Sequence, residues 1–179
     1  MAVIGLFGGR FDPPHLGHLA LAQAAIERFG IEELHVTVVV DAGHKPSVAP
    51  IEHRLELARL TFAPLGAVVE PEPHRYTVDA LEARGYEDPI FLIGADQLAE
   101  LPTWKQPQRV LELARLGVAT RPGYAPGTPS ERIETFELEQ HDVSSTEIRR
   151  RIGRGEPVDG LVVPEVAAYI AEHGLYRDG

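Results

Sequence analysis

Two histidines three residues apart, His15 and His18, have the types and spacing to do chemistry on an anion. They follow two glycines, Gly8 and Gly9, and the apolar run 3–7 precedes those glycines. A strand, a glycine turn and a helix start form a phosphate site, because glycines let the backbone approach an anion and helix-start N–H groups point at it. Neighbouring turns of one helix face aim both imidazoles the same way.

Two other interpretations of the histidines compete with a phosphate site. They fit a pair of metal ligands, as in a metal-dependent hydrolase. They also fit two side chains that lie at a helix start and have no chemical role. The sequence has no H-E-x-x-H pattern and no third ligand at a suitable spacing, so we expect no metal held by the protein. The whole block 8–18 after a strand is far more specific than four residues alone, and it favours the phosphate site.

Length and composition favour a single domain over residues 1–179. Of the 179 residues, 44% are hydrophobic, and the formal net charge is −10 at pH 7. The negative charge argues against a broad surface for nucleic acid. No apolar run approaches a membrane span, no signal-peptide layout opens the chain and cysteine is absent, so we expect a cytoplasmic protein without disulfides. The sequence leaves the oligomeric state open, and a homo-oligomer is compatible with it.

Strand and helix patterns alternate along the whole chain. The expected strands cover residues 3–7, 34–40, 67–69, 90–93, 116–120 and 133–138. The expected helices cover residues 19–29, 51–62, 77–84, 110–115 and 164–173, and a further helix starts near residue 144. This alternation predicts an α/β fold, a doubly wound, Rossmann-like parallel sheet with helices on both faces. Ligands bind outside the carboxyl ends of such strands, where residues 8–18, 41–46, 94–96 and 121–124 fall.

Five motifs follow one another in the chain. They are G-G-R-F-D-P-P-H-L-G-H at 8–18, F-L-I-G-A-D at 91–96, L-P-T-W-K at 101–105, R-P-G-Y at 121–124 and S-S-T-E-I-R at 144–149. In this order and spacing the chain resembles bacterial nicotinate-nucleotide adenylyltransferases, within the nucleotidyltransferase superfamily, over essentially its whole length. The resemblance implies a reaction of ATP with nicotinate mononucleotide that gives nicotinate adenine dinucleotide and pyrophosphate, in NAD biosynthesis.

The resemblance implies an ATP site with His15, His18 and Arg149 as catalytic residues. His18 would stabilise the charge that develops at the α-phosphate, and Mg²⁺ would arrive on the triphosphate. Residues 144–179 would complete this site, with Ser144 also fitting a capping box with Glu147. The full set of residues expected at ATP is Gly8, Gly9, Arg10, Phe11, His15, Gly17, His18, Gly94, Asp96, Arg121, Ser144, Ser145 and Arg149.

On the acceptor side, the resemblance implies contacts from three segments. Lys45 would meet the mononucleotide phosphate as a point charge, and Trp104 would stack on the pyridine ring. Lys105, the next residue, would also bind the mononucleotide. The backbone N–H groups near Tyr76 and Thr77 would accept the nicotinate carboxylate. Thr77 also fits an ordinary helix N-cap.

Two alternatives to this function stay open from the residues. Pantetheine-phosphate adenylyltransferase would share the His15 to His18 chemistry but not the L-P-T-W segment. A non-catalytic nucleotide-binding regulator would use the same fold, although it would have no need of the whole set of His15, His18, Lys45 and Arg149. Turnover of ATP to pyrophosphate with each acceptor separates these functions.

Overall fold

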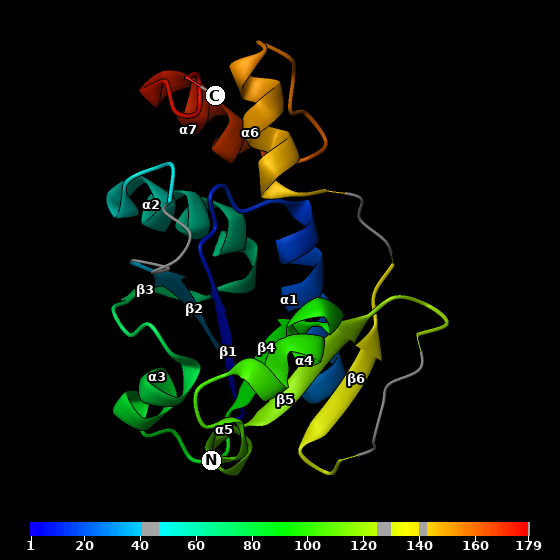
Figure 1. Ribbon diagram of the computed structural model, residues 1–179. Helices are drawn as coiled ribbons and strands as arrows, with labels where there is room; N and C mark the ends of the chain where they lie inside the picture. The colour runs from blue at the N-terminus through cyan, green and yellow to red at the C-terminus, as the bar shows by residue number, and fades with distance from the viewer. Residues whose placement is uncertain (41–46, 125–129, 140–142, 179) are drawn as a thin grey trace.

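The computed structural model describes residues 1–40, 47–124, 130–139 and 143–178. One sheet of six parallel strands has the order β3-β2-β1-β4-β5-β6 (Figure 1). The strands are β1 (Ile4–Gly9), β2 (Glu33–Val39), β3 (Val68–Glu72), β4 (Ile90–Gly94), β5 (Arg115–Thr120) and β6 (Ile133–Glu137). The chain builds outward from β1 to one edge, then returns beside β1 with β4 and builds the other half. This is the doubly wound, single-domain α/β fold that the sequence predicts.

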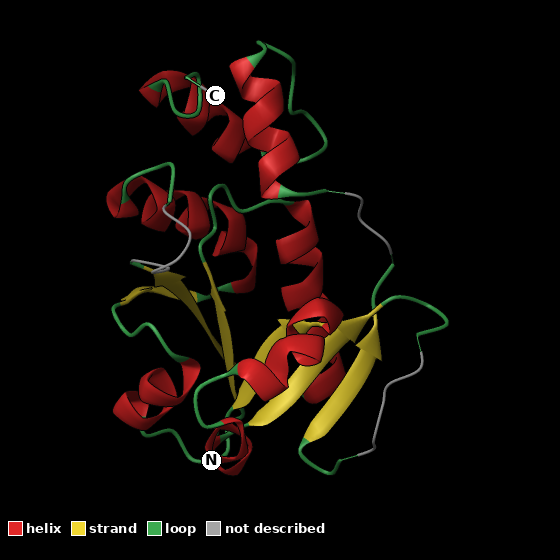
Figure 2. Ribbon diagram, in the orientation of Figure 1, coloured by secondary structure: helices red, strands yellow, loops and turns green. Residues whose placement is uncertain are grey.

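Helices cover both faces of the sheet (Figure 2). The helices beside the sheet are α1 (Leu16–Phe29), α2 (Ile51–Phe62), α3 (Thr77–Arg84), α4 (Ala95–Glu100) and α5 (Pro107–Leu113). Phe7 of β1 packs with Ala22 of α1 and Phe62 of α2. The preceding side chain of β1, Leu6, points to the other face and packs with residues of α3 and α5 such as Leu81. Because side chains alternate along a strand, neighbouring residues of β1 serve two separate apolar cores.

The C-terminal segment packs on α2 rather than on the sheet. Helices α6 (Ser145–Gly153) and α7 (Pro164–His173) contribute Ile148 and Val166 to a third apolar cluster, where they meet Leu57 of α2. Both helices lie at the end of the molecule where β1 runs into α1 (Figure 1). The Leu16 N–H donates to the carbonyl of Leu161 at 2.9 Å, which ties this segment to the start of α1.

Several predicted boundaries were wrong by a few residues, and one helix was missed. β1 runs to Gly9 instead of ending at Phe7, because Gly8 and Gly9 pair with Thr37 and Val38 of β2. Helix α4 has six residues, which is too short to show a helical period in the sequence. Two 3₁₀ turns, η1 (Ala63–Leu65) and η2 (Leu101–Thr103), follow α2 and α4. Within the described ranges, no helix is long and apolar enough to span a membrane.

Candidate active site

The turn between β1 and α1 is made by Phe11 and not by the glycines. Phe11 has a φ of 48°, in the left-handed region, and its ring is buried at 2% exposure. Gly8 and Gly9 are extended residues of β1, so the expected glycine turn was wrong. A Cβ on Gly9 would lie 3.2 Å from the Phe11 ring, and a Cβ on Gly8 would lie 3.1 Å from Thr37 Oγ1. Glycine is therefore favoured by close packing at these positions, while Phe11 carries the unusual backbone angle.

The turn is anchored by the buried carboxylate of Asp12. It accepts hydrogen bonds from the backbone N–H groups of Val48 at 2.6 Å and Ala49 at 3.1 Å. It also accepts one from the Tyr176 hydroxyl at 2.8 Å. Burial raises the pKa of Tyr176, and the neighbouring Asp12 charge raises it further, so the phenol stays protonated as a donor. The turn, the start of α2 and the C-terminus therefore meet at one side chain.

His15 and His18 cap helix α1 reciprocally. Nδ1 of His15 accepts from the N–H groups of Gly17 at 3.1 Å and His18 at 3.4 Å. Nδ1 of His18 accepts from the N–H of His15 at 3.0 Å. This is the hydrogen-bond pattern of a capping box, with imidazoles in place of a hydroxyl and a carboxamide. Since each Nδ1 is an acceptor, the proton of each neutral ring lies on Nε2.

The pKa of His18 lies well below that of a free imidazole. Desolvation by burial is the main cause, and repulsion from the adjacent His15 adds to it. Both effects favour a neutral ring at pH 7. A proton on Nδ1 would also remove the acceptor that caps the His15 N–H, which is a further reason for the ring to stay neutral. The arrangement can therefore offer the Nε2–H of His18 to an anion as a neutral donor.

A pocket of about 740 Å³ opens above this helix start. It lies between the carboxyl ends of β1, β4 and β5, on both sides of the point where the sheet changes direction. The predicted ATP residues that line it are Gly8, Gly9, Phe11, His15, Gly17, His18, Gly94, Asp96 and Arg121. Gln97 also lines it, and its Oε1 accepts from the Gly94 N–H at 3.2 Å.

A second pocket, of about 300 Å³, lies on the other side of β1. Predicted acceptor residues Tyr76 and Thr77 line it, at the N-terminus of α3. Thr77 is the first helical residue and Tyr76 the N-cap, so the expected Thr77 cap was wrong. Neither makes a side-chain cap, which leaves helix-start N–H groups available to an anion. The two pockets share Gly8, Gly9 and Gln97.

Arg10 lies in a different pocket from the one expected. It lines the smaller pocket and not the larger one. Side chains alternate between the two faces along a strand, but Arg10 lies just after the last residue of β1. The direction of the turn therefore decides which pocket Arg10 faces. Nothing in the sequence pattern indicates that direction.

The predicted residues of α6 contact the turn after β1. Ser145 Oγ donates to the carbonyl of Pro13 at 2.7 Å, and Arg149 Nη1 donates to the carbonyl of Asp12 at 2.8 Å. Ser144 Oγ accepts from the Glu147 N–H at 3.1 Å, as expected of the cap. The Glu147 carboxylate binds arginines of its own helix instead of closing the box. The lining of the larger pocket includes Val143 but none of Ser144, Ser145 and Arg149.

Two further predicted residues lie beside the smaller pocket. Trp104 is half-buried and packs edge-on against Phe91, with ring centroids 6.4 Å apart, and Phe91 lines the pocket. Lys105 Nζ lies 2.9 Å from both carboxylate oxygens of Asp79 and 5.0 Å from the Tyr76 ring centroid. Lys45 lies outside the described residues.

Known proteins with this sequence pattern match along the whole chain. The cytidylyltransferase-like family model matches residues 6–151. A protein of Roseiflexus sp. (strain RS-1) is 37% identical over 98% of both chains. One of Thermus thermophilus is 41% identical over 97% of this chain and 99% of its own. Both carry the name "Probable nicotinate-nucleotide adenylyltransferase". This chain belongs to the nicotinate-nucleotide adenylyltransferase family.

A solved structure has the same fold at much lower identity. It is the nicotinic acid mononucleotide adenylyltransferase of Plasmodium falciparum complexed with NaAD, with a TM-score of 0.80, 15% identity and 98% of both chains covered. At that identity the match concerns the fold alone. In the described part of this family member, no three His, Asp or Glu side chains gather in a cluster that could hold a metal ion.

The family motifs gave no signal for Arg54, which is buried at 1% exposure in α2. Its guanidinium donates to four backbone carbonyls: Ala49 at 2.9 Å, Arg10 at 3.0 Å, Val39 at 2.7 Å and Val40 at 3.2 Å. It therefore joins the turn after β1 to the chain on both sides of residues 41–46. Asp12 lies within the motif at 8–18, but no role was predicted for it or for Tyr176, because their partners are distant in sequence.

Proposed function

We propose that this chain transfers the adenylyl group of ATP to nicotinate mononucleotide, giving nicotinate adenine dinucleotide and pyrophosphate. The single observation that carries the proposal is the pair of pockets that meet at Gly8, Gly9 and Gln97. A reaction between two bound substrates needs two sites whose ends touch. Membership of the adenylyltransferase family indicates which reaction joins the two substrates. We assign ATP to the larger pocket and the mononucleotide to the smaller one.

In this mechanism a phosphate oxygen of the mononucleotide attacks the α-phosphorus of ATP in line. The new P–O bond forms as the bond to the β-phosphate oxygen breaks, and pyrophosphate leaves. No covalent enzyme intermediate is required, so positioning and charge stabilisation supply most of the acceleration. The Nε2–H of His18 is proposed to donate to the α-phosphate as its charge develops. Mg²⁺ would enter as part of the ATP substrate.

The roles of the remaining residues are part of the same proposal. Asp96 lines the larger pocket, and its carboxylate suits the ribose hydroxyls of ATP. Ser145 and Arg149 adjoin the turn that precedes His15 and are proposed to reach the distal phosphates. Arg10, given its pocket, is now proposed to contact the mononucleotide and not ATP. Trp104 is proposed to stack on the pyridine ring beside Phe91. The protein is proposed to act in the cytoplasm.

A preference for the acid over the amide acceptor follows from the N-terminus of α3. Its N–H groups suit the nicotinate carboxylate, whereas the NH₂ of an amide would face another donor. Unpaired polar groups of this kind cost about 1–3 kcal/mol each, which corresponds to roughly 5- to 150-fold in kcat/KM.

The decisive experiment measures pyrophosphate release from ATP with three acceptors in parallel: nicotinate mononucleotide, nicotinamide mononucleotide and 4′-phosphopantetheine. We expect the highest kcat/KM with the acid mononucleotide. Turnover with 4′-phosphopantetheine alone would instead support the neighbouring adenylyltransferase, and no turnover with any acceptor would support a nucleotide-binding regulator.

A further inference from the structure

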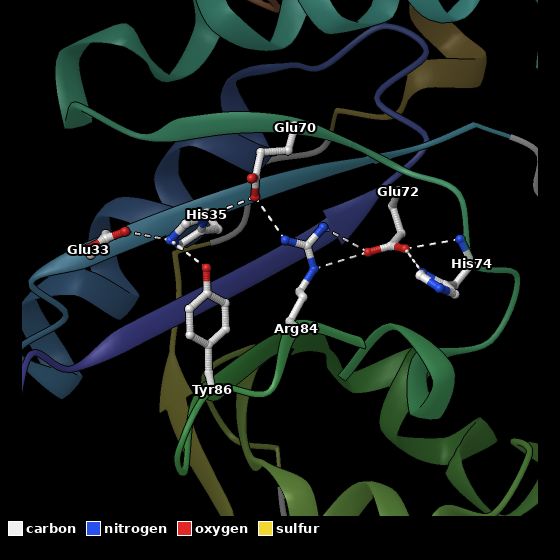
Figure 3. A network of polar contacts seen from close by, with 7 residues as sticks. All are labelled: Glu33, His35, Glu70, Glu72, His74, Arg84 and Tyr86. Atoms are coloured by element: carbon white, nitrogen blue, oxygen red, sulfur yellow. Dashed lines mark hydrogen bonds and ion pairs between the residues drawn. The ribbon is translucent and has the colours of Figure 1, made fainter. Parts of the chain in front are cut away.

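The smaller pocket contains a carboxylate whose charge is fully paired. Glu72, at the end of β3, lines the pocket and is 5% exposed. One of its oxygens accepts from the His74 N–H at 3.0 Å and from His74 Nδ1 at 2.7 Å (Figure 3). The other accepts from Nε and Nη2 of Arg84, at 3.2 and 2.9 Å. Two donors on each oxygen leave the carboxylate well satisfied.

Arg84 is fixed in place from its other side. Its Nη1 donates to Glu70 at 2.8 Å, and Glu70 in turn contacts His35 at 3.0 Å (Figure 3). Burial alone would lower the pKa of Arg84, but the hydrogen bonds to Glu72 and Glu70 outweigh it and raise the pKa. The guanidinium therefore stays charged and held in one orientation, with a planar fork toward Glu72.

The charge of this pocket suits an anionic ligand only while Glu72 is paired. Among the described residues that line it, Glu72 is the one acidic side chain, whereas Arg10, Arg75 and Arg84 are basic. An unpaired carboxylate in a partly buried pocket repels another anion strongly, because little water screens it. The nicotinate acceptor carries a ring carboxylate, and its amide counterpart does not.

We propose that Arg84 is a specificity-determining residue of the acceptor pocket, which neutralises Glu72 so that the pocket accepts the carboxylate of the acid mononucleotide. Arg84 acts through Glu72 and is a positioning and charge-balancing residue. The inference rests on the proposed function, and it adds a source of acid preference separate from the N–H groups of α3.

The test compares kcat/KM for nicotinate and nicotinamide mononucleotide in the wild type, Arg84→Gln, Glu72→Gln and the double variant. The ratio of the two values is independent of the fraction of folded enzyme, so partial unfolding of a variant does not blur the result. Arg109→Gln is the matched control. Arg109 also pairs with two carboxylates, Glu82 and Glu112, but lies on the exposed surface outside the pocket.

We expect Arg84→Gln to lower the acid-to-amide ratio by about tenfold or more, since the freed Glu72 charge repels the ring carboxylate, which the amide lacks. Glu72→Gln should keep the acid preference, and the double variant should restore it to within about threefold of the wild type. An unchanged ratio in Arg84→Gln, or a double variant with no recovery, would overturn the inference. If the wild type itself releases no pyrophosphate with either mononucleotide, the proposed function fails instead.

Discussion

The imidazoles of His15 and His18 stack on each other, with ring centroids 3.7 Å apart and planes 24° from parallel. Each ring also accepts a backbone N–H at the start of α1 through its Nδ1. Stacking and capping together fix both rings before any substrate binds. A site organised in this way loses little free energy to rearrangement during the reaction, which is what charge stabilisation in a transition state requires.

Replacement of His18 by alanine is expected to lower kcat by about 10²-fold or more, because the Nε2–H donor at the α-phosphate is lost. His18→Gln should lower kcat similarly but keep the cap, since a glutamine at this helix position accepts the same N–H. The free energy of unfolding should therefore fall by about 0.5–2 kcal/mol in His18→Ala and by less in His18→Gln. Near-normal kcat in both variants would remove His18 from the mechanism.

The stability of the protein should depend on pH through His18. The pKa of this ring is lowered in the folded state, so below about pH 6.5 the unfolded chain binds more protons than the folded one. The stability that the neutral His18 ring contributes to the folded state is present above that pH. It is lost as the pH falls toward the folded-state pKa of His18. Replacing His18 by glutamine should flatten the slope, by at most about 1.4 kcal/mol per pH unit. Denaturant unfolding of both proteins from about pH 5 to about pH 7.5 measures it, and equal slopes would contradict the shift.

Arg54→Met should destabilise the fold by about 3 kcal/mol or more, because four buried or partly buried backbone carbonyls lose their donor at once. Arg59→Met is the control, since Arg59 lies on the same helix but is exposed and, among the described residues, pairs only with Glu56. Urea unfolding gives both values. A loss below about 1 kcal/mol for Arg54→Met would mean that water or other donors replace the guanidinium.

Tyr176→Phe tests the connection between the C-terminus and the turn after β1. It removes the hydroxyl that donates to Asp12 at 2.8 Å, and a loss of about 1–3 kcal/mol in stability is expected. Because Asp12 lies three residues before His15, kcat/KM should fall as well. Tyr169→Phe is the matched control, since its hydroxyl lies 2.9 Å from His53 Nδ1 and the residue lines neither pocket. If Tyr176→Phe lowers kcat/KM no more than Tyr169→Phe does, the Asp12 contact does not organise the turn.

Most of the fold was predictable because its signals are local. The alternation of apolar runs and helical periods reflects which faces are buried, and that pattern is present in each segment by itself. The helices at 51–62, 77–84 and 164–173 were predicted within their observed bounds. Helix α4 was missed since six residues show less than two helical turns. The glycine turn was mistaken because Phe11, and not a glycine, adopts the left-handed conformation.

The sequence by itself determined the order of strands and helices, the residues at the carboxyl ends of the strands and the two histidines at a helix start. The tertiary structure alone decided which distant side chains meet. Tyr176 reaches Asp12, Arg54 reaches the ends of two strands, Arg84 pairs with Glu72, and Arg10 faces the smaller pocket. Hydrophobic periodicity is a property of neighbouring residues, whereas a buried polar group must find its partner wherever the sheet order brings one close.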